Sequence, residues 1–195
     1  MTPDRKPHLF ALLMVAVAPL CWAGNIVLGK GVSTLIPPVA LAFWRWAVAF
    51  LILLPLTWPY VKRDWRAALA GWKIISLLAF FGVTTFNTLL YLAVHTTTAI
   101  NVALIQTTMP AVIIIISLIL YGERISWIQT AGVMLCMTGA AVVVLKGSWR
   151  ALVSMALVQG DLVMLLAVVF YALYSALLPK RPNIHPFGFL TYTFG

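Results

Sequence analysis

Charged residues are scarce in this sequence. They make up 9% of its 195 residues, whereas soluble domains carry about 25%. The four acidic residues, Asp4, Asp64, Glu123 and Asp161, lie at the ends of long apolar runs or between them, so no proton relay or cation-binding glutamate inside a membrane helix is indicated. Because 63% of the residues are hydrophobic, we predict an all-α polytopic membrane protein.

Cysteine and the usual signatures of catalysis are also scarce. The two cysteines, Cys21 and Cys136, both fall inside apolar runs, which excludes a disulfide framework and a pair spaced for a metal ion. The sequence shows no paired nucleophile and base, no metal triad and no phosphate-cradling glycine loop. We therefore expect no cofactor, no metal and no catalytic residue.

Basic residues dominate the charge, with a net value of +9, but they occupy short loops and form no basic face. This pattern orients helices in a membrane and excludes nucleic acid as a partner. One side carries nine cations: Arg5, Lys6, Lys62, Arg63, Arg66, Lys73, Arg124, Lys180 and Arg181. The other side carries three: Lys30, Lys146 and Arg150. The positive-inside rule predicts an inner-membrane protein with a cytoplasmic N-terminus.

Six apolar runs are long enough to cross a bilayer, which takes about twenty residues. They are Leu9–Gly29, Val39–Trp58, Trp72–Ala93, Ala99–Tyr121, Ser126–Leu145 and Asp161–Leu178. A seventh begins at Pro186 and stops at Gly195, so it is too short to span. Proline removes a helix hydrogen bond, so bends are expected at Pro19, Pro55 and Pro110.

A weak internal repeat links the first span to the sixth, 149 residues later: Trp22, Ala23 and Asn25 correspond to Tyr171, Ala172 and Tyr174. Because five spans lie within one period, the second copy would enter the membrane from the opposite side. The expected domains are residues 1–148, a first five-helix repeat, then 149–159, an external linker, and 160–195, the incomplete start of a second repeat.

Several short motifs occur in a fixed order along the chain. They are Cys21-Trp22-Ala23-Gly24-Asn25, Phe43-Trp44-Arg45-Trp46, Tyr91-Leu92-Ala93, Pro110, the tight turn Gly122-Glu123-Arg124, Gly132 and Gly139. Together they resemble the EamA domain, the unit of the drug/metabolite transporter superfamily, and within it the amino-acid and metabolite exporters of the YddG type. The resemblance implies ten helices in two inverted halves of five around a central cavity. This chain would hold six of those helices and the start of the seventh.

Polar residues line up on several predicted membrane helices, where lipid could not satisfy them. In the third span Thr84, Asn87, Thr88, Tyr91 and His95 follow helical spacing on one face. With aromatic residues of the first and sixth spans, they favour a wall that binds amphipathic organic molecules. Hydrogen bonding between helices would explain the same pattern. The cavity candidates are Trp22, Asn25, Asn87, Tyr91, Asn101, Tyr171 and Tyr174.

Two further assignments concern the second and fourth spans. Asn101 and Gln106 lie about 140° apart on an ideal helix, so we expect Asn101 in the cavity and Gln106 at a helix contact. Arg45 lies inside the second span, about 10 Å from its outer end. It would either bind a substrate carboxylate or, as we favour, hydrogen-bond to helix ends as a structural residue.

The predicted function is a membrane transporter that exports small metabolites, such as amino acids and aromatic ones among them, or drugs, by alternating access. The alternatives are an intramembrane enzyme and a non-transporting structural subunit. The lack of paired catalytic groups argues against the enzyme, and the aligned polar residues argue against the subunit. The expected partners are a small-molecule substrate and the lipid bilayer, and nothing in the sequence indicates the oligomeric state.

Overall fold

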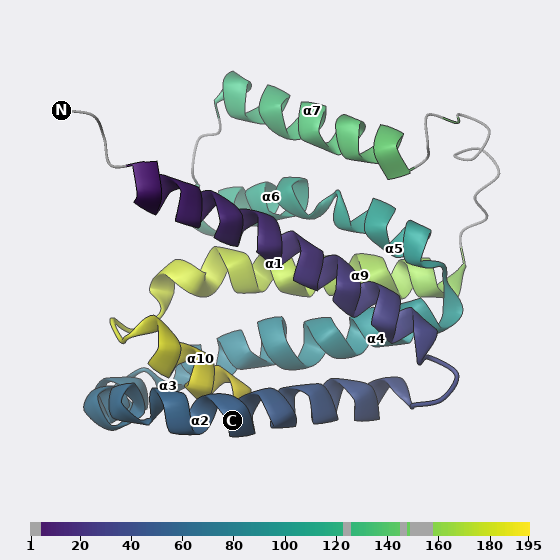
Figure 1. Ribbon diagram of the computed structural model, residues 1–195. Helices are drawn as coiled ribbons and strands as arrows, with labels where there is room; N and C mark the ends of the chain where they lie inside the picture. Colours follow the sequence, from purple (N-terminus) through teal and green to yellow (C-terminus); the bar gives the residue numbers. More distant parts are fainter. Residues whose placement is uncertain (1–4, 123–125, 145–147, 149–157) are drawn as a thin grey trace.

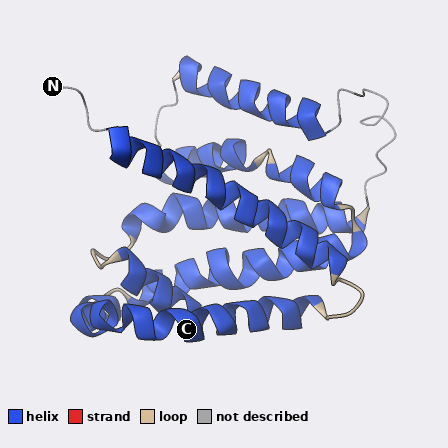
Figure 2. Cartoon of the chain, in the orientation of Figure 1, coloured by secondary structure: helices blue, strands red, loops and turns tan. Residues whose placement is uncertain are grey.

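The computed structural model describes residues 5–122, 126–144, 148 and 158–195, and all elements among them are helices (Figure 1, Figure 2). In chain order they are α1 (Arg5–Gly31), α2 (Pro38–Ala70), α3 (Trp72–Leu78), the π-helix η1 (Ala79–Thr85), α4 (Phe86–Thr96), α5 (Ala99–Gln106), α6 (Met109–Tyr121), α7 (Trp127–Val144), α9 (Gln159–Leu177), the 3₁₀-helix η2 (Leu178–Lys180) and α10 (Pro186–Phe194).

Five described segments are long and apolar enough to cross a membrane: Met14–Gly31, Pro38–Ala70, Trp72–Thr96, Ala99–Tyr121 and Gln159–Lys180. The predicted fifth span corresponds to α7, whose apolar stretch Trp127–Val142 is shorter, and its predicted end at Leu145 lies outside the described residues. The predicted start of a seventh span is α10, which has nine residues. The chain is therefore an all-α, multi-pass membrane protein.

Two of the spans are not continuous α-helices. The third contains the π-helix η1 between α3 and α4. The fourth is interrupted between α5 and α6, and Pro110 lies in the first turn of α6, where its missing N–H costs no helix bond. In contrast, α1 and α2 continue as helices through Pro19 and Pro55. Of the three prolines, Pro110 alone coincides with a break in the helix.

The predicted tight turn begins where expected. Helix α6 ends at Gly122, which has a left-handed backbone with a φ of 65° and donates its N–H to the carbonyl of Leu118 at 2.8 Å. Glycine adopts this conformation without the steric penalty of a Cβ atom. The next two residues of the predicted turn, Glu123 and Arg124, lie outside the described residues.

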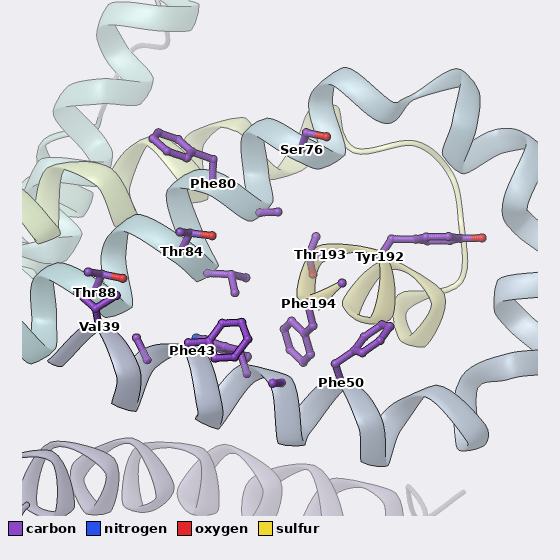
Figure 3. Close-up of a pocket in the computed structure, with 16 residues that line it drawn as sticks. Val39, Phe43, Phe50, Ser76, Phe80, Thr84, Thr88, Tyr192, Thr193 and Phe194 are labelled. Carbon is purple, nitrogen blue, oxygen red and sulfur yellow. The ribbon is translucent and has the colours of Figure 1, made fainter. Parts of the chain in front are cut away.

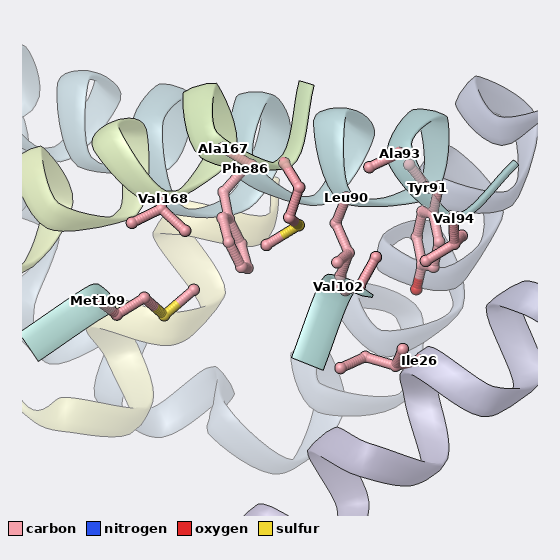
Figure 4. Packing of buried hydrophobic residues seen from close by; sticks show 12 residues of the cluster. Ile26, Phe86, Leu90, Tyr91, Ala93, Val94, Val102, Met109, Ala167 and Val168 are labelled. Carbon is pink, nitrogen blue, oxygen red and sulfur yellow. The ribbon is translucent and has the colours of Figure 1, made fainter. Parts of the chain in front are cut away.

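Helix α9 lies at the centre of the bundle, where it packs against α4, α5, α6 and η1 (Figure 1). Small residues permit this close approach, since Ala93 and Ala167 are fully buried and a Cβ atom on Gly160 would lie 2.5 Å from Thr96 Oγ1. Around them packs a cluster of buried side chains that includes Phe86, Leu90, Val94, Val102, Met109 and Val168 (Figure 4). The core therefore already includes a helix from the predicted second repeat.

Among the described residues, most of the cations between spans lie at one end of the bundle. The junction of α2 with α3 and the η2 segment lie at one end, whereas the connections from α1 to α2 and from α4 to α5 lie at the other (Figure 1). Lys62, Arg63, Lys73 and Lys180 belong to the first end. At the second end, Lys30 Nζ donates to the carbonyls of α4's last residues, which joins α1 to α4.

Helices α1 and α9 run in opposite directions across the bundle (Figure 1). Corresponding helices of an inverted repeat would have this relation. The inverted repeat and its ten-helix architecture stay a prediction, as do the domain limits that follow from it.

Candidate functional site

A cavity of about 460 Å³ opens between six helical segments in the interior of the bundle. We call it the aromatic cavity. It is lined by Ala18, Cys21, Trp22 and Asn25 of α1, Arg45 and Trp46 of α2, Gly82 and Val83 of η1, Phe86, Asn87 and Leu90 of α4, Tyr171 and Tyr174 of α9, and Leu190, Thr193 and Phe194 of α10. Its volume falls within the usual range of small-molecule sites, about 300–1,000 Å³.

The π-helix forms one wall of this cavity and is held by Asn87. The side-chain Nδ2 of Asn87 donates to the carbonyl oxygens of Gly82 at 3.1 Å and Val83 at 2.9 Å. A π-turn inside an α-helix disturbs the regular backbone bonding and frequently marks a functional position. Asn87, which is buried, therefore stabilises an irregular backbone at the cavity wall.

The oxygen of the same amide binds the cation of the cavity. Arg45 donates from Nη2 to Asn87 Oδ1, and its guanidinium carbon lies 4.3 Å from the ring centroid of Trp46 and 5.6 Å from that of Tyr91. Such rings attract a cation through their π faces. The Nε atom of Arg45 is buried without a hydrogen-bond partner. The guanidinium is thus held in place on one side while part of its donor capacity is unused.

Tyr91 closes the cavity toward α1. It is only 2% exposed and donates its hydroxyl to Asn25 Oδ1 at 2.6 Å. A Cβ atom on Gly29 would lie 2.9 Å from the Tyr91 ring, so the glycine permits this close approach of α1 and α4. Tyr91 itself does not line the cavity, but it fixes the position of Asn25, which does. Figure 4 shows Tyr91 among the buried residues of α4.

The remaining wall is aromatic. The ring centroid of Trp22 lies 5.7 Å from that of Phe86 and 5.7 Å from that of Tyr171, and the Tyr171 and Tyr174 centroids are 5.8 Å apart. Trp22 Nε1 donates to Gln106 Oε1 at 3.1 Å, which leaves the face of the indole available. A Cβ atom on Gly82 would lie 2.5 Å from the Tyr174 ring, so α9 packs tightly on the π-helix. The arrangement joins α1, α4 and α9 through tilted and edge-to-face ring contacts.

The structure brings together most of the residues that the sequence pointed to. Trp22, Asn25, Arg45, Asn87, Tyr171 and Tyr174 all line the aromatic cavity. The expectation that Arg45 bonds to helix ends is not met, because its bond goes to the Asn87 side chain. Three other lining residues, Phe86, Gly82 and Trp46, were not among the predicted cavity residues, since neither an apolar aromatic ring nor a glycine in a membrane helix by itself indicates a binding site.

Asn101 lies elsewhere, contrary to the expectation for the fourth span. Its Nδ2 donates to both carboxylate oxygens of Asp161 at 3.2 Å. Asp161 is 2% exposed and also accepts from Thr97 Oγ1 at 2.5 Å and from the backbone N–H of Val158 at 3.0 Å. Asn101 therefore holds the start of α9 rather than the cavity wall.

Gln106 lies at a helix contact, as expected, because its Oε1 accepts from Trp22 Nε1 and so joins α5 to α1. Its Nε2 atom is buried without a hydrogen-bond partner. Asn101 lies in the first turn of α5, and its partner Asp161 belongs to another helix. The angle between Asn101 and Gln106 on an ideal helix therefore could not reveal the bond between Asn101 and Asp161.

A second hollow of about 660 Å³ lies beside the cavity, between α2 and the third span (Figure 3). We call it the lateral groove. Thr84 and Thr88 of the predicted polar face line it, together with Val39, Phe43 and Phe50 (Figure 3). The polar face of the third span is thus divided, since Asn87 faces the cavity and the two threonines face the groove. The groove has no charged lining residue, so we take the aromatic cavity as the candidate site.

Within the described part of the chain, no three His, Cys, Asp or Glu side chains are grouped to hold a metal ion. The polar groups of the cavity are amides, hydroxyls and one guanidinium, which bind organic ligands by hydrogen bonds and charge.

Comparison with known proteins gives a family and not a substrate. The model of the EamA-like transporter family matches residues 9–145. An uncharacterized transporter of Archaeoglobus fulgidus is 30% identical over 175 residues, which cover 89% of this chain and 57% of that protein. The uncharacterized transporter YyaM of Bacillus subtilis is 25% identical over 173 residues, or 87% of this chain and 56% of that protein. No solved structure matches the chain significantly.

These comparisons extend the resemblance noted in the sequence without refining it. The chain spans just over half the length of the curated relatives it matches. Neither relative has a named substrate, so the likeness to exporters of the YddG type stays a prediction. The family match covers most of the chain, including the motifs on α1, α2, α4 and α6. This multi-pass membrane protein belongs to the EamA-like transporter family of the drug/metabolite transporter superfamily.

Proposed function

We propose that the protein exports small amphipathic metabolites, such as amino acids and aromatic ones among them, or drugs, by alternating access. The observation that carries the proposal is the position of the aromatic cavity. Helices α1, α2 and α4 on one side of the cavity belong to the segment that matches the family model. Helices α9 and α10 on the other side come after that segment in the chain. Transporters built from inverted repeats bind their substrates at such a junction of repeats.

The composition of the cavity supports an amphipathic substrate. Arg45, Asn25 and Asn87 place polar groups on the walls formed by α1, α2 and α4, whereas Trp22, Phe86 and Tyr171 supply a continuous ring surface. A ligand with one polar end and an apolar body would satisfy both kinds of wall. A purely polar ligand would leave the rings without apolar contacts, and a purely apolar one would leave Arg45 desolvated.

Alternating access requires helices that can change their path, and the structure supports a place for this change. The π-helix η1 interrupts the third span beside the cavity, and the break before Met109 interrupts the fourth span. Helices of transporters are commonly discontinuous near the substrate site. Because Asn87 holds η1 and also binds Arg45, a ligand at Arg45 would act directly on the irregular segment.

The predicted orientation would define the path of export through the bundle. We propose that the protein lies in the inner membrane of the cell. The cation-rich end of the bundle, where α2 joins α3, would face the cytoplasm. Export would then carry substrate toward the end at which α1 joins α2. The positive-inside rule supports this orientation.

The proposal is tested by obstructing the cavity from α1. Ala18 lines the cavity, whereas its neighbour Val17 is 45% exposed and does not line it. We expect Ala18→Phe to reduce saturable phenylalanine counterflow in vesicles several-fold, because the added ring occupies the cavity. Val17→Phe, the matched control, should leave counterflow near that of the unmodified protein. Equal counterflow by the two variants, or no saturable counterflow without any substitution, would contradict the proposal.

A further inference from the structure

The aromatic cavity contains one charged side chain, Arg45, and neither of the acidic residues in the described part of the chain pairs with it. Among the described residues, the ion pair is formed by Arg63 and Asp64, far along α2 from Arg45, and Asp161 is held by Thr97 and Asn101. We infer that a substrate carboxylate is the missing counter-ion of Arg45, so that the cavity selects carboxylates attached to an apolar or aromatic body. This inference rests on the proposed function and names the substrate class of the same site.

The environment of Arg45 is incomplete as a purely structural site. An arginine inside a membrane helix is energetically costly, so such a residue normally has a compensating partner. Here the partners are one amide oxygen, of Asn87, and two ring faces, and none of them is an anion. The buried Nε–H still lacks an acceptor. A carboxylate would supply the missing negative charge, because a guanidinium can bind two carboxylate oxygens at once.

The contacts around Arg45 also prepare it for such a ligand. Asn87 orients one terminal nitrogen, and the rings of Trp46 and Tyr91 flank the guanidinium. A long, flexible side chain is therefore already ordered before the ligand arrives, which lowers the entropic cost of binding. Asn87 is in turn fixed by its two bonds to the π-helix.

The same cavity offers an ammonium group no anion. No carboxylate lines it, and two of its amide oxygens already accept hydrogen bonds, Asn25 Oδ1 from Tyr91 and Asn87 Oδ1 from Arg45. An ammonium group would lose its hydration without gaining an anionic partner. An aromatic carboxylate without an amino group should therefore bind more tightly than the corresponding amino acid.

The test compares three ligands of similar body and different charge: 3-phenylpropionate, phenylalanine and the uncharged 2-phenylethanol. Their dissociation constants are measured by calorimetry on the purified protein in detergent, with and without Arg45→Gln. Glutamine removes the charge and keeps an amide that can donate to Asn87. Arg66→Gln is the matched control, because Arg66 is an exposed arginine of the same helix that lies outside the cavity.

We expect the unmodified protein to bind 3-phenylpropionate about tenfold or more tightly than 2-phenylethanol, and more tightly than phenylalanine. Arg45→Gln should abolish the preference for the carboxylate over the alcohol, and Arg66→Gln should retain it. A ratio of affinities is unaffected by a general loss of folded protein, so a structural role of Arg45 would not change it. An unchanged ratio in Arg45→Gln, or equal binding of carboxylate and alcohol, overturns the inference and leaves the proposed function standing. Binding of none of the three ligands, together with no saturable counterflow, contradicts both.

Discussion

Replacement of Asn101 by leucine separates a structural role from a role in the cavity. Asp161 is 2% exposed, and three groups donate to its carboxylate: the Asn101 amide, the Thr97 hydroxyl and the Val158 backbone N–H. Leucine has a similar size but cannot donate a hydrogen bond. Asn101→Leu would therefore leave a buried carboxylate with two of its three donor groups. The aromatic cavity would be untouched, because Asn101 does not line it.

The expected loss follows from the energy of one bond to a charged group, about 1.5–3 kcal/mol. For a chain of this length, each kcal/mol shifts the melting temperature by about 2–4 °C, so we expect Asn101→Leu to melt about 3–12 °C lower. The assay is thermal unfolding in detergent, measured beside the dissociation constant of a cavity ligand such as phenylalanine. That dissociation constant should stay the same.

A second variant isolates the interaction with Asp161. In the background of Asp161→Asn the carboxylate is absent, so the further change Asn101→Leu should cost less than it does in the unmodified protein, as a double-mutant cycle would show. Gln106→Leu is the comparison on the same span, because it removes the acceptor of the cavity residue Trp22 and should weaken ligand binding. If Asn101→Leu leaves the melting temperature unchanged and weakens ligand binding several-fold, Asn101 belongs to the cavity and our reasoning is refuted.

Two further predictions concern packing and orientation. Gly82→Ala should destabilise the protein by about 1–3 kcal/mol, because the new Cβ atom would lie 2.5 Å from the Tyr174 ring. Gly132 has open space around it, so Gly132→Ala is the control and should not lower the melting temperature. The orientation is tested with Ser148→Cys and Ala67→Cys, each in a protein whose two native cysteines have been replaced. In intact cells, an impermeant thiol reagent should label the cysteine at position 148 but not the one at position 67, and the reverse pattern would overturn the orientation that we propose.

Much of the fold could be predicted because membrane helices leave a strong local signal. Length and hydropathy located the starts of the spans at Val39, Trp72 and Ala99 to within one residue, although the second span extends to Ala70 and not to Trp58, and Gly122 marked the end of a helix. The π-helix Ala79–Thr85 could not be predicted, because its stabilising bonds come from Asn87 and its irregular path is adjusted to the packing of α9 on Gly82. Local propensity contains no information about such contacts.

The candidate site was predictable where helical spacing and residue type agreed, as for Trp22, Asn25 and Asn87. The prediction placed Asn101 incorrectly in space because its partner, Asp161, lies sixty residues away along the chain, beyond the reach of any helical wheel. For the same reason the sequence could not show that Gln106 bonds to Trp22. Pairings between distant helices decide which polar residues reach the cavity and which hold the helices together.

The central claim is that the aromatic cavity binds the transported substrate, and the two native cysteines test it most directly. Cys21 lines the cavity, whereas Cys136 lies exposed on α7, away from it. The unmodified protein is treated with N-ethylmaleimide, and the modification of each cysteine is followed by peptide mass spectrometry. Our account predicts that saturating phenylalanine slows the modification of Cys21 several-fold and leaves the rate at Cys136 unchanged. If phenylalanine slows neither reaction, or slows both equally, substrate does not bind in this cavity.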